Sequence, residues 1–228
     1  EIPLRLVGSE MCIRDSVDTD GRYAAVCDYK TGSPKLSLNE IMEGLSLQLI
    51  TYLLALSKTK DTKDLLPAAM MYIYLHGRPK SISVPPNGIP HPKEKENTNG
   101  IFLNDPDVLR TLDSQSGTDD GFIGVSYVKD GSVKKTSPVL TAEEFEALKA
   151  LTEKILIRLY NRLESGEIAI HPVKNGTLSP CSYCPYRSIC RFDPALPENS
   201  FDYISKVSDK TIREKLDEEM KRNGKENL

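Results

Sequence analysis

The sequence predicts a mixed α/β (α+β) fold, because two strand-like segments precede a helix-like segment and a further strand. Residues 11–17 and 22–31 have the β-branched and aromatic content of strands, and turn-forming residues lie between them at 18–21. Residues 38–57 follow with apolar side chains at helical spacing. The uninterrupted apolar run at 68–75 is typical of a strand that is buried on both faces.

A capping box marks the start of the first expected helix. Ser37 can accept a hydrogen bond from the first helical turn, and Glu40 can return one to the chain before it. We expect one continuous helix over residues 38–57. Its apolar stripe consists of Ile41, Leu45, Leu49, Leu53 and Leu56.

A longer helix organises the second half of the chain. Thr141 and Glu144 form another capping box, and the helix that they open is expected to run to about Glu164, ahead of Gly166. The Pro-, Asn- and Gly-rich residues 85–100 predict a surface loop, and the residues between that loop and the helix predict no firm element. The last twenty residues are strongly charged and predict a solvated helix with a frayed end.

Length and composition indicate a globular domain with appendages. The chain has 228 residues, a net charge of -3 and no apolar run long enough to cross a membrane, so we expect a cytoplasmic protein with no membrane partner. It begins with Glu1 inside a strand-like segment, which indicates a fragment. We divide it into a doubtful N-terminal segment at residues 1–16, a main domain at 17–193 and a charged tail at 194–228.

Asp28 and Lys30 are the candidate catalytic pair. They lie two positions apart in the second expected strand, so both side chains leave the same face. A carboxylate can bind a divalent cation, and an adjacent ammonium can hold an attacking water. Phosphodiester hydrolysis needs both, because negative charge builds up on the phosphate oxygens. Taken alone, an Asp-x-Lys triplet is equally consistent with a surface ion pair at a strand end.

A hard cation such as Mg²⁺ needs a second oxygen ligand, and Asp15 is the candidate. A hairpin that reverses at Gly21–Arg22 places Asp15 opposite Asp28, whereas one that reverses at Thr19–Asp20 places it out of register. The position of the turn therefore decides whether the two carboxylates can form one site.

Three of the five cysteines are bunched near the end of the main domain and indicate metal binding. Cys181, Cys184 and Cys190 supply three thiolates from one loop, whereas a [4Fe–4S] cluster or a structural zinc usually takes four soft ligands. His171 can complete a zinc site. The alternative is three unrelated buried cysteines, and a disulfide scaffold is not expected in a chain without a secretory signal.

These motifs resemble a known family. Asp28–Gly32, followed by Gly44–Leu49 and Tyr52, resembles the RecB-type branch of the PD-(D/E)XK nuclease superfamily. Cys181–Asp193 is similar to the iron–sulfur end of the AddB family of helicase–nuclease subunits, so that the matches together span residues 17–193. The resemblance implies a restriction-endonuclease-like core, truncated at its N-terminus, with a C-terminal cysteine-cluster segment.

The resemblance also implies roles for the site residues. Asp15 and Asp28 would bind Mg²⁺ with help from the backbone carbonyl of Tyr29, and Lys30 would orient and activate the attacking water.

Gln48 and Tyr52 match the Gln-x-x-x-Tyr motif of the resembling family. Four positions apart on a helix, they share one face and could contact the DNA strand or position Lys30. Without the resemblance, Gln48 would be interpreted as a solvated helix residue and Tyr52 as half-buried packing.

The N-terminal segment departs from the family pattern. The family reads Gly-Arg-Ile-Asp-Arg-Val-Asp where this chain has Cys12–Asp18, so Asp15 keeps the acidic position and its neighbours differ. Residues 6–16 also resemble translated sequencing-adaptor sequence. The family's upstream helix, with its histidine, and its upstream fourth cysteine have no counterpart in this sequence.

The leading functional prediction is a Mg²⁺-dependent exonuclease module of an ATP-dependent helicase–nuclease complex that acts in double-strand break repair and recombination. DNA and a helicase–nuclease partner subunit are the expected partners. One alternative is a stand-alone RecB-like exonuclease, although the long insertion at 85–138 and the cysteine segment argue against it. Another is a non-catalytic iron–sulfur domain that binds DNA or acts as a scaffold.

Overall fold

The computed structural model describes residues 15–19, 21–32, 34–75, 98–118, 121–177, 179–197 and 199–226. Within these ranges a five-stranded sheet forms the centre of the main body, in the order β1-β2-β3-β4-β5. The strands are β1 (Asp15–Thr19), β2 (Tyr23–Lys30), β3 (Leu66–Tyr74), β4 (Thr98–Leu103) and β5 (Val139–Leu140). β2 is parallel to β3 and antiparallel to β1, while β4 is antiparallel to β3 and parallel to β5. The mixed sheet confirms the predicted fold class.

The β1–β2 hairpin decides between the two alternatives for Asp15. The Cα atoms of Asp15 and Asp28 are direct partners across the ladder, so the chain reverses around Gly21 and Arg22. Gly21 has a φ of 87°, a left-handed conformation that glycine adopts without steric cost in a tight turn. The register that pairs the two aspartates is therefore confirmed.

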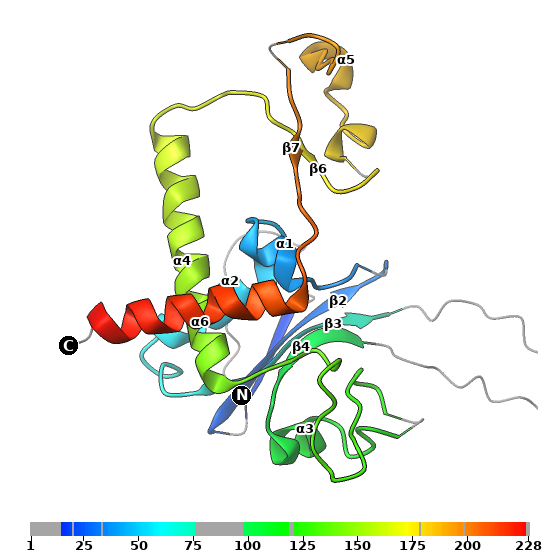
Figure 1. Ribbon diagram of the computed structural model, residues 1–228, viewed down its shortest axis with the longest axis vertical. Helices are drawn as coiled ribbons and strands as arrows, with labels where there is room; N and C mark the ends of the chain where they lie inside the picture. The colour runs from blue at the N-terminus through cyan, green and yellow to red at the C-terminus, as the bar shows by residue number, and fades with distance from the viewer. Residues whose placement is uncertain are drawn as a thin grey trace, which may run out of the picture.

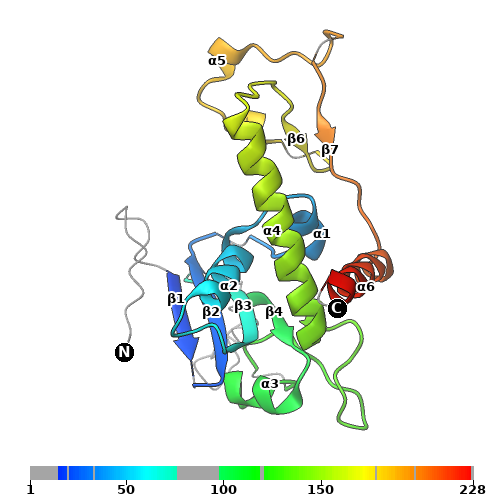
Figure 2. The ribbon, with the colours of Figure 1, turned by 90° about the vertical axis from the view of Figure 1, so that its left-hand side faces the viewer.

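Helices lie on both faces of the sheet, as Figures 1 and 2 show. α2 (Gln48–Lys58) packs on β2 and β3, and α4 (Ala142–Glu164) packs on α2 and β3, with α1 (Leu38–Met42) beside α4. α3 (Pro106–Leu112) lies on the opposite face. Side chains from the sheet and from these helices meet in one core, whose largest fully buried members include Phe102, Phe145, Ile50, Met70 and Leu148.

The helix that we expected over residues 38–57 is interrupted between α1 and α2, so the prediction of a continuous helix was wrong. The Gly44 N–H donates to the Ile41 carbonyl at 3.0 Å, and the Leu45 N–H donates to the Glu40 carbonyl at 2.8 Å. This pair of bonds is the Schellman arrangement that ends helices, and Gly44 supplies the left-handed φ of 84° that it requires. The stripe is nevertheless buried on both sides of the break, at Ile41, Leu49, Leu53 and Leu56.

The loop expected at residues 85–100 was predicted three residues too long, because β4 already begins at Thr98. Residues 85–97 lie outside the described ranges. β4 and α3 follow where no firm element was expected, and a capped start stabilises α3, since Asp105 accepts hydrogen bonds from the N–H groups of Asp107 and Val108.

α4 agrees with its prediction at both ends. The Thr141 hydroxyl accepts from the Glu144 N–H at 3.2 Å, and the Glu144 carboxylate accepts from the Thr141 N–H at 2.8 Å. The helix ends at Glu164, and Gly166 follows with a left-handed φ of 73°.

α6 (Asp209–Glu226) forms the expected C-terminal helix, but one of its faces is not solvated. It packs across α4 (Figure 1) and buries Ile212, Leu216 and Glu219. Arg213 reaches from α6 to the Glu144 carboxylate at 2.5 Å. The prediction of a solvated helix rested on the high overall charge of this segment. It overlooked Ile212 and Leu216, two apolar residues one turn apart that dock the helix.

The residues between α4 and α6 form a projection that we call the cysteine lobe (residues 173–203). β6 (Val173–Lys174) and β7 (Asp202–Tyr203) pair in parallel at its base, and a 3₁₀ turn (Pro180–Ser182) and α5 (Arg187–Cys190) lie between them. Both ribbon views show the lobe standing clear of the sheet, beyond the end of α4 (Figures 1 and 2). Nowhere in the described part of the chain is a helix both long and apolar enough to cross a membrane.

Candidate active site

Asp28 and Lys30 lie where β2 leaves the core. Residues 24–27 are buried, Asp28 is still only 3% exposed, and the Lys30 side chain is 32% exposed. Because side chains alternate along a strand, both project from the face that α2 covers. The Lys30 Nζ lies 2.5 Å from the Asp28 Oδ2. This ion pair compensates a carboxylate charge that burial alone would strongly disfavour.

The connection between β2 and β3 brings Gln48 and Tyr52 to the same place. Because these strands are parallel, the chain must cross the sheet face after β2, and α2 makes that crossing. The Lys30 Nζ donates to the Gln48 Oε1 at 3.3 Å, and the Gln48 Nε2 donates to the Tyr52 hydroxyl at 3.3 Å. Gln48 and Tyr52 therefore share one face of α2, as expected, and Gln48 contacts Lys30, which was one of the two roles that we considered for it.

Tyr72 belongs to this cluster and was not predicted. It is the β3 partner of Asp28, is 5% exposed, and has the Lys30 Nζ 5.3 Å from its ring centroid, within cation–π range. Burial, followed by the negative charges of Asp28 and Glu40, raises the pKa of Tyr72 above its ordinary value. The only signal in the sequence was an aromatic side chain with a polar tip within the apolar run at 68–75, which we predicted as a buried strand.

Asp15 and Tyr29 have different positions relative to the Asp28 carboxylate. Directly opposite residues on antiparallel strands share a face of the sheet, so the register assigns Asp15 to the face of Asp28. The Asp15 side chain lies outside the described residues. Tyr29 lines a cavity of about 500 Å³ between the sheet and α3, on the other face.

The donor chemistry of this site suits a hard cation, because a buried carboxylate oxygen is the kind of ligand that Mg²⁺ prefers. Asp28 is the buried acidic side chain that the structure describes there. Among the described side chains, no three of the His, Cys, Asp and Glu type gather into a metal site. A complete set of metal ligands would therefore need further oxygen atoms. The candidates are the carboxylate of Asp15, which the strand register assigns to this face, and the backbone carbonyl of Tyr29.

The three bunched cysteines lie in the cysteine lobe. None of the described cysteines is in a disulfide; Cys181 is partly buried, and Cys184 and Cys190 are exposed. The alternative of three buried cysteines was therefore wrong. The three thiols do not converge in this structure, with or without His171, so no geometry for a cluster or a zinc ion follows from it.

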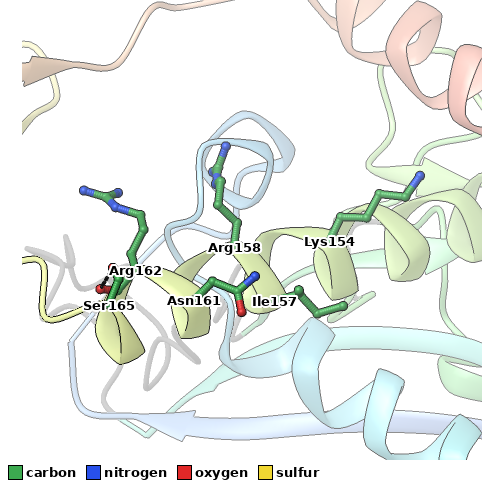
Figure 3. Close-up of a pocket in the computed structure, with 6 residues that line it drawn as sticks. All are labelled: Lys154, Ile157, Arg158, Asn161, Arg162 and Ser165. Atoms are coloured by element: carbon green, nitrogen blue, oxygen red, sulfur yellow. Dashed lines mark hydrogen bonds between the residues drawn. The ribbon is translucent and has the colours of Figure 1, made fainter.

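A second hollow, of about 520 Å³, runs along the outer side of α4. Figure 3 shows its lining side chains, which come from α4 and from Ser165 directly after it: Lys154, Ile157, Arg158, Asn161, Arg162 and Ser165. Lys154 is paired with Glu219 and Arg162 with Glu167. Within the described residues, no second element lines this hollow.

The fold and this cluster define a class of protein. Residues 11–191 match the PD-(D/E)XK nuclease superfamily, which is most of the chain. The chain belongs to this superfamily. The resemblance seen in the sequence motifs is thereby confirmed, and so is the prediction of a nuclease.

The chain is also similar to bacterial proteins that are each named as a subunit of an ATP-dependent helicase/deoxyribonuclease. The relative from Clostridium acetobutylicum is 30% identical over 222 residues, which cover 93% of this chain and 19% of the relative. The relative from Desulforamulus reducens is 32% identical over 201 residues (83% and 17%), and that from Alkaliphilus oremlandii is 27% identical over 209 residues (89% and 18%). The chain thus spans about a fifth of the length of these relatives.

Proposed function

We propose that this chain is the nuclease module of an ATP-dependent helicase–nuclease complex, and that it hydrolyses DNA phosphodiester bonds with Mg²⁺ during double-strand break repair and recombination in the cytoplasm. The observation that carries the proposal is the ion pair between Asp28 and Lys30, completed by Gln48, in a member of a nuclease superfamily. The relatives' name supports DNA as the substrate and a helicase complex as the setting.

Asp15, Asp28 and the carbonyl of Tyr29 would hold the cation. When bound, Mg²⁺ would neutralise the charge that develops on the phosphate oxygens. The Lys30 ammonium has three N–H donors. Asp28 and Gln48 fix two of its directions, and a third would orient a water toward the phosphorus. The water oxygen forms a bond to phosphorus as one P–O bond of the DNA backbone breaks; the water releases a proton to the solvent, and the leaving oxygen takes one up.

A digestion assay with linear DNA and Mg²⁺ tests this proposal. Asp28→Ala and Lys30→Ala should each lower the rate by about 100-fold or more, because each removes a group that stabilises or orients the reacting atoms. Lys58→Ala is the matched control, since Lys58 is an exposed lysine paired with Glu153. Wild-type DNA loss in both site variants would contradict the proposal. DNA binding without cleavage by the wild-type protein would favour the scaffold alternative.

We further propose that Cys181, Cys184 and Cys190 bind a [4Fe–4S] cluster, with zinc as the alternative and a fourth ligand from outside this trio. None of the three is in a disulfide, and two of them are exposed, which supports a metal-binding role over packing. The test is to measure the metal and sulfide content of anaerobically purified wild-type protein and of the Cys184→Ser variant. Iron with sulfide supports the cluster, and zinc supports the alternative. A wild-type protein with neither contradicts both.

A further inference from the structure

We propose that Glu40 is a positioning residue that couples the cysteine lobe to the Lys30 ammonium through Ser46 and Gln48. The inference rests on the proposed function, because it gives the Lys30 site a support outside the sheet.

The two oxygens of the Glu40 carboxylate are held by two different parts of the chain. The Oε1 accepts from the Asn175 Nδ2 at 3.0 Å, and Asn175 directly follows β6 in the cysteine lobe. The Oε2 accepts from the Ser46 hydroxyl at 2.9 Å, in the break between α1 and α2. Hydrogen bonds to a carboxylate are stronger than bonds between neutral groups, so Glu40 is a firm bridge between lobe and break.

This use of Glu40 differs from the one expected from its capping box. The Glu40 N–H does donate to the Ser37 hydroxyl, at 3.5 Å. Its carboxylate is turned away from that turn and toward Ser46 and Asn175 instead. The side chain is therefore committed to a contact that spans 135 positions of sequence rather than to its own helix.

Ser46 needs support because of its backbone. Its φ of 51° is left-handed, a conformation that is unfavourable for a residue with a side chain. Only Leu47 separates it from Gln48, and Leu47 provides no side-chain cap for α2. The bond from Ser46 to Glu40 therefore helps to fix the position at which α2 begins.

Gln48 links the start of α2 to the Lys30 ammonium. As the first residue of α2, it accepts from the Lys30 Nζ at 3.3 Å. Glu40 is also near enough to the cluster for its charge to contribute to the raised pKa of Tyr72. The path from the lobe to the ammonium is thus Asn175, Glu40, Ser46, Gln48 and Lys30.

Asn39 offers a matched control for this path. It lies next to Glu40 in α1, and its Nδ2 donates to the Ser205 carbonyl at 3.0 Å, just beyond β7. Asn39 therefore ties the same helix to the chain at the base of the same lobe, but it has no bond to Ser46. Loss of this tie should affect stability without affecting the Lys30 ammonium.

The test compares DNA hydrolysis by the full chain and its variants. Glu40→Ala should lower kcat about 10-fold to 100-fold with KM within about twofold, as expected when a reacting group is misplaced. Glu40→Gln keeps one acceptor and should recover part of that loss. Ser46→Gly removes the hydroxyl but keeps the left-handed backbone accessible, and combined with Glu40→Ala it should add no further loss. Asn39→Ala should keep the wild-type kcat.

Hydrogen exchange provides a readout that does not depend on activity. In Asn175→Ala, amides of the peptide at residues 43–52 should exchange about 10-fold faster, whereas in Asn39→Ala they should not. Unchanged exchange in Asn175→Ala overturns the link to the lobe. If Glu40→Ala keeps the wild-type kcat while Lys30→Ala is inactive, the positioning role of Glu40 is overturned and the proposed function is not. Full activity in Lys30→Ala overturns the proposed function instead, and the exchange experiment then still decides the physical link.

Discussion

Lys30 and Gln48 are eighteen positions apart in sequence, and the ammonium of one donates to the amide oxygen of the other at 3.3 Å. The contact exists because β2 and β3 are parallel and α2 crosses the sheet between them. Together with the 2.5 Å ion pair to Asp28, it holds the ammonium in two directions. The geometry of the site therefore depends on where α2 begins as well as on the strand that carries Lys30.

Gln48→Ala should lower kcat for DNA hydrolysis by about 10-fold to 100-fold, because it frees the Lys30 ammonium in one direction. Tyr52→Phe removes the bond that orients Gln48 but leaves Gln48 in place, and it should cost about twofold to fivefold. Steady-state rates at saturating DNA measure both. A larger loss in Tyr52→Phe than in Gln48→Ala would contradict the order of this chain of contacts.

Tyr72 should make the stability of the fold depend on pH in the alkaline range. Burial and its anionic neighbours raise its pKa in the folded state above the value of about 10 for an unfolded tyrosine. The corresponding stabilisation is present below pH ~10 and is lost as pH rises toward the folded pKa, because the unfolded chain releases its proton first. Urea unfolding of wild type and Tyr72→Phe from about pH 8 to 11 measures it. The wild type should lose stability relative to the variant above pH ~10, and parallel curves would contradict the assignment.

Gly100→Ala should destabilise the β3–β4 ladder. A Cβ at Gly100 would lie 2.5 Å from the Met71 Cβ and 2.7 Å from the Met70 carbonyl oxygen, closer than real atoms approach. Overpacking of this kind costs about 1–3 kcal/mol in the free energy of unfolding. Gly124→Ala is the control, since a Cβ there meets nothing within 4 Å. Chemical denaturation that showed equal midpoints for the two variants would contradict the close approach.

Leu216→Ala tests whether α6 is part of the main body. Leu216 is fully buried against α4, so its truncation should lower the free energy of unfolding by about 2–5 kcal/mol. Leu163→Ala, at a position 77% exposed on α4, should change it by less than about 0.5 kcal/mol. Thermal denaturation compares the two. Equal effects would mean that α6 is not docked in solution.

The strand that carries Asp28 and Lys30 and the helix face that pairs Gln48 with Tyr52 could both be predicted from the sequence, whereas the register of Asp15 stayed open between two positions of the hairpin turn until the structure decided it. Each depends on spacing within one segment or on the position of a single turn. Tyr72 could not be predicted as a member of the site, because that required the order of the strands, and Tyr72 is 44 positions from Asp28 along the chain.

Glu40 illustrates a second limit of sequence patterns. Its spacing from Ser37 fits a capping box, yet its carboxylate bonds to Asn175, and no local pattern encodes that contact. The break between α1 and α2 was encoded, in Gly44, but the apolar stripe continues through it, and the stripe dominated the prediction. Local rules therefore located the candidate site residues, whereas the contacts that support them depend on tertiary packing.

A crystal of the protein soaked with Mn²⁺ tests the central claim most directly, because this cation replaces Mg²⁺ and can be located by its anomalous scattering. The account predicts a peak about 2 Å from a carboxylate oxygen of Asp28, with the Lys30 ammonium on the same face of the sheet, and no such peak in Asp28→Ala. A wild-type crystal with its Mn²⁺ bound elsewhere, or with Lys30 turned to the face that α3 covers, would contradict it.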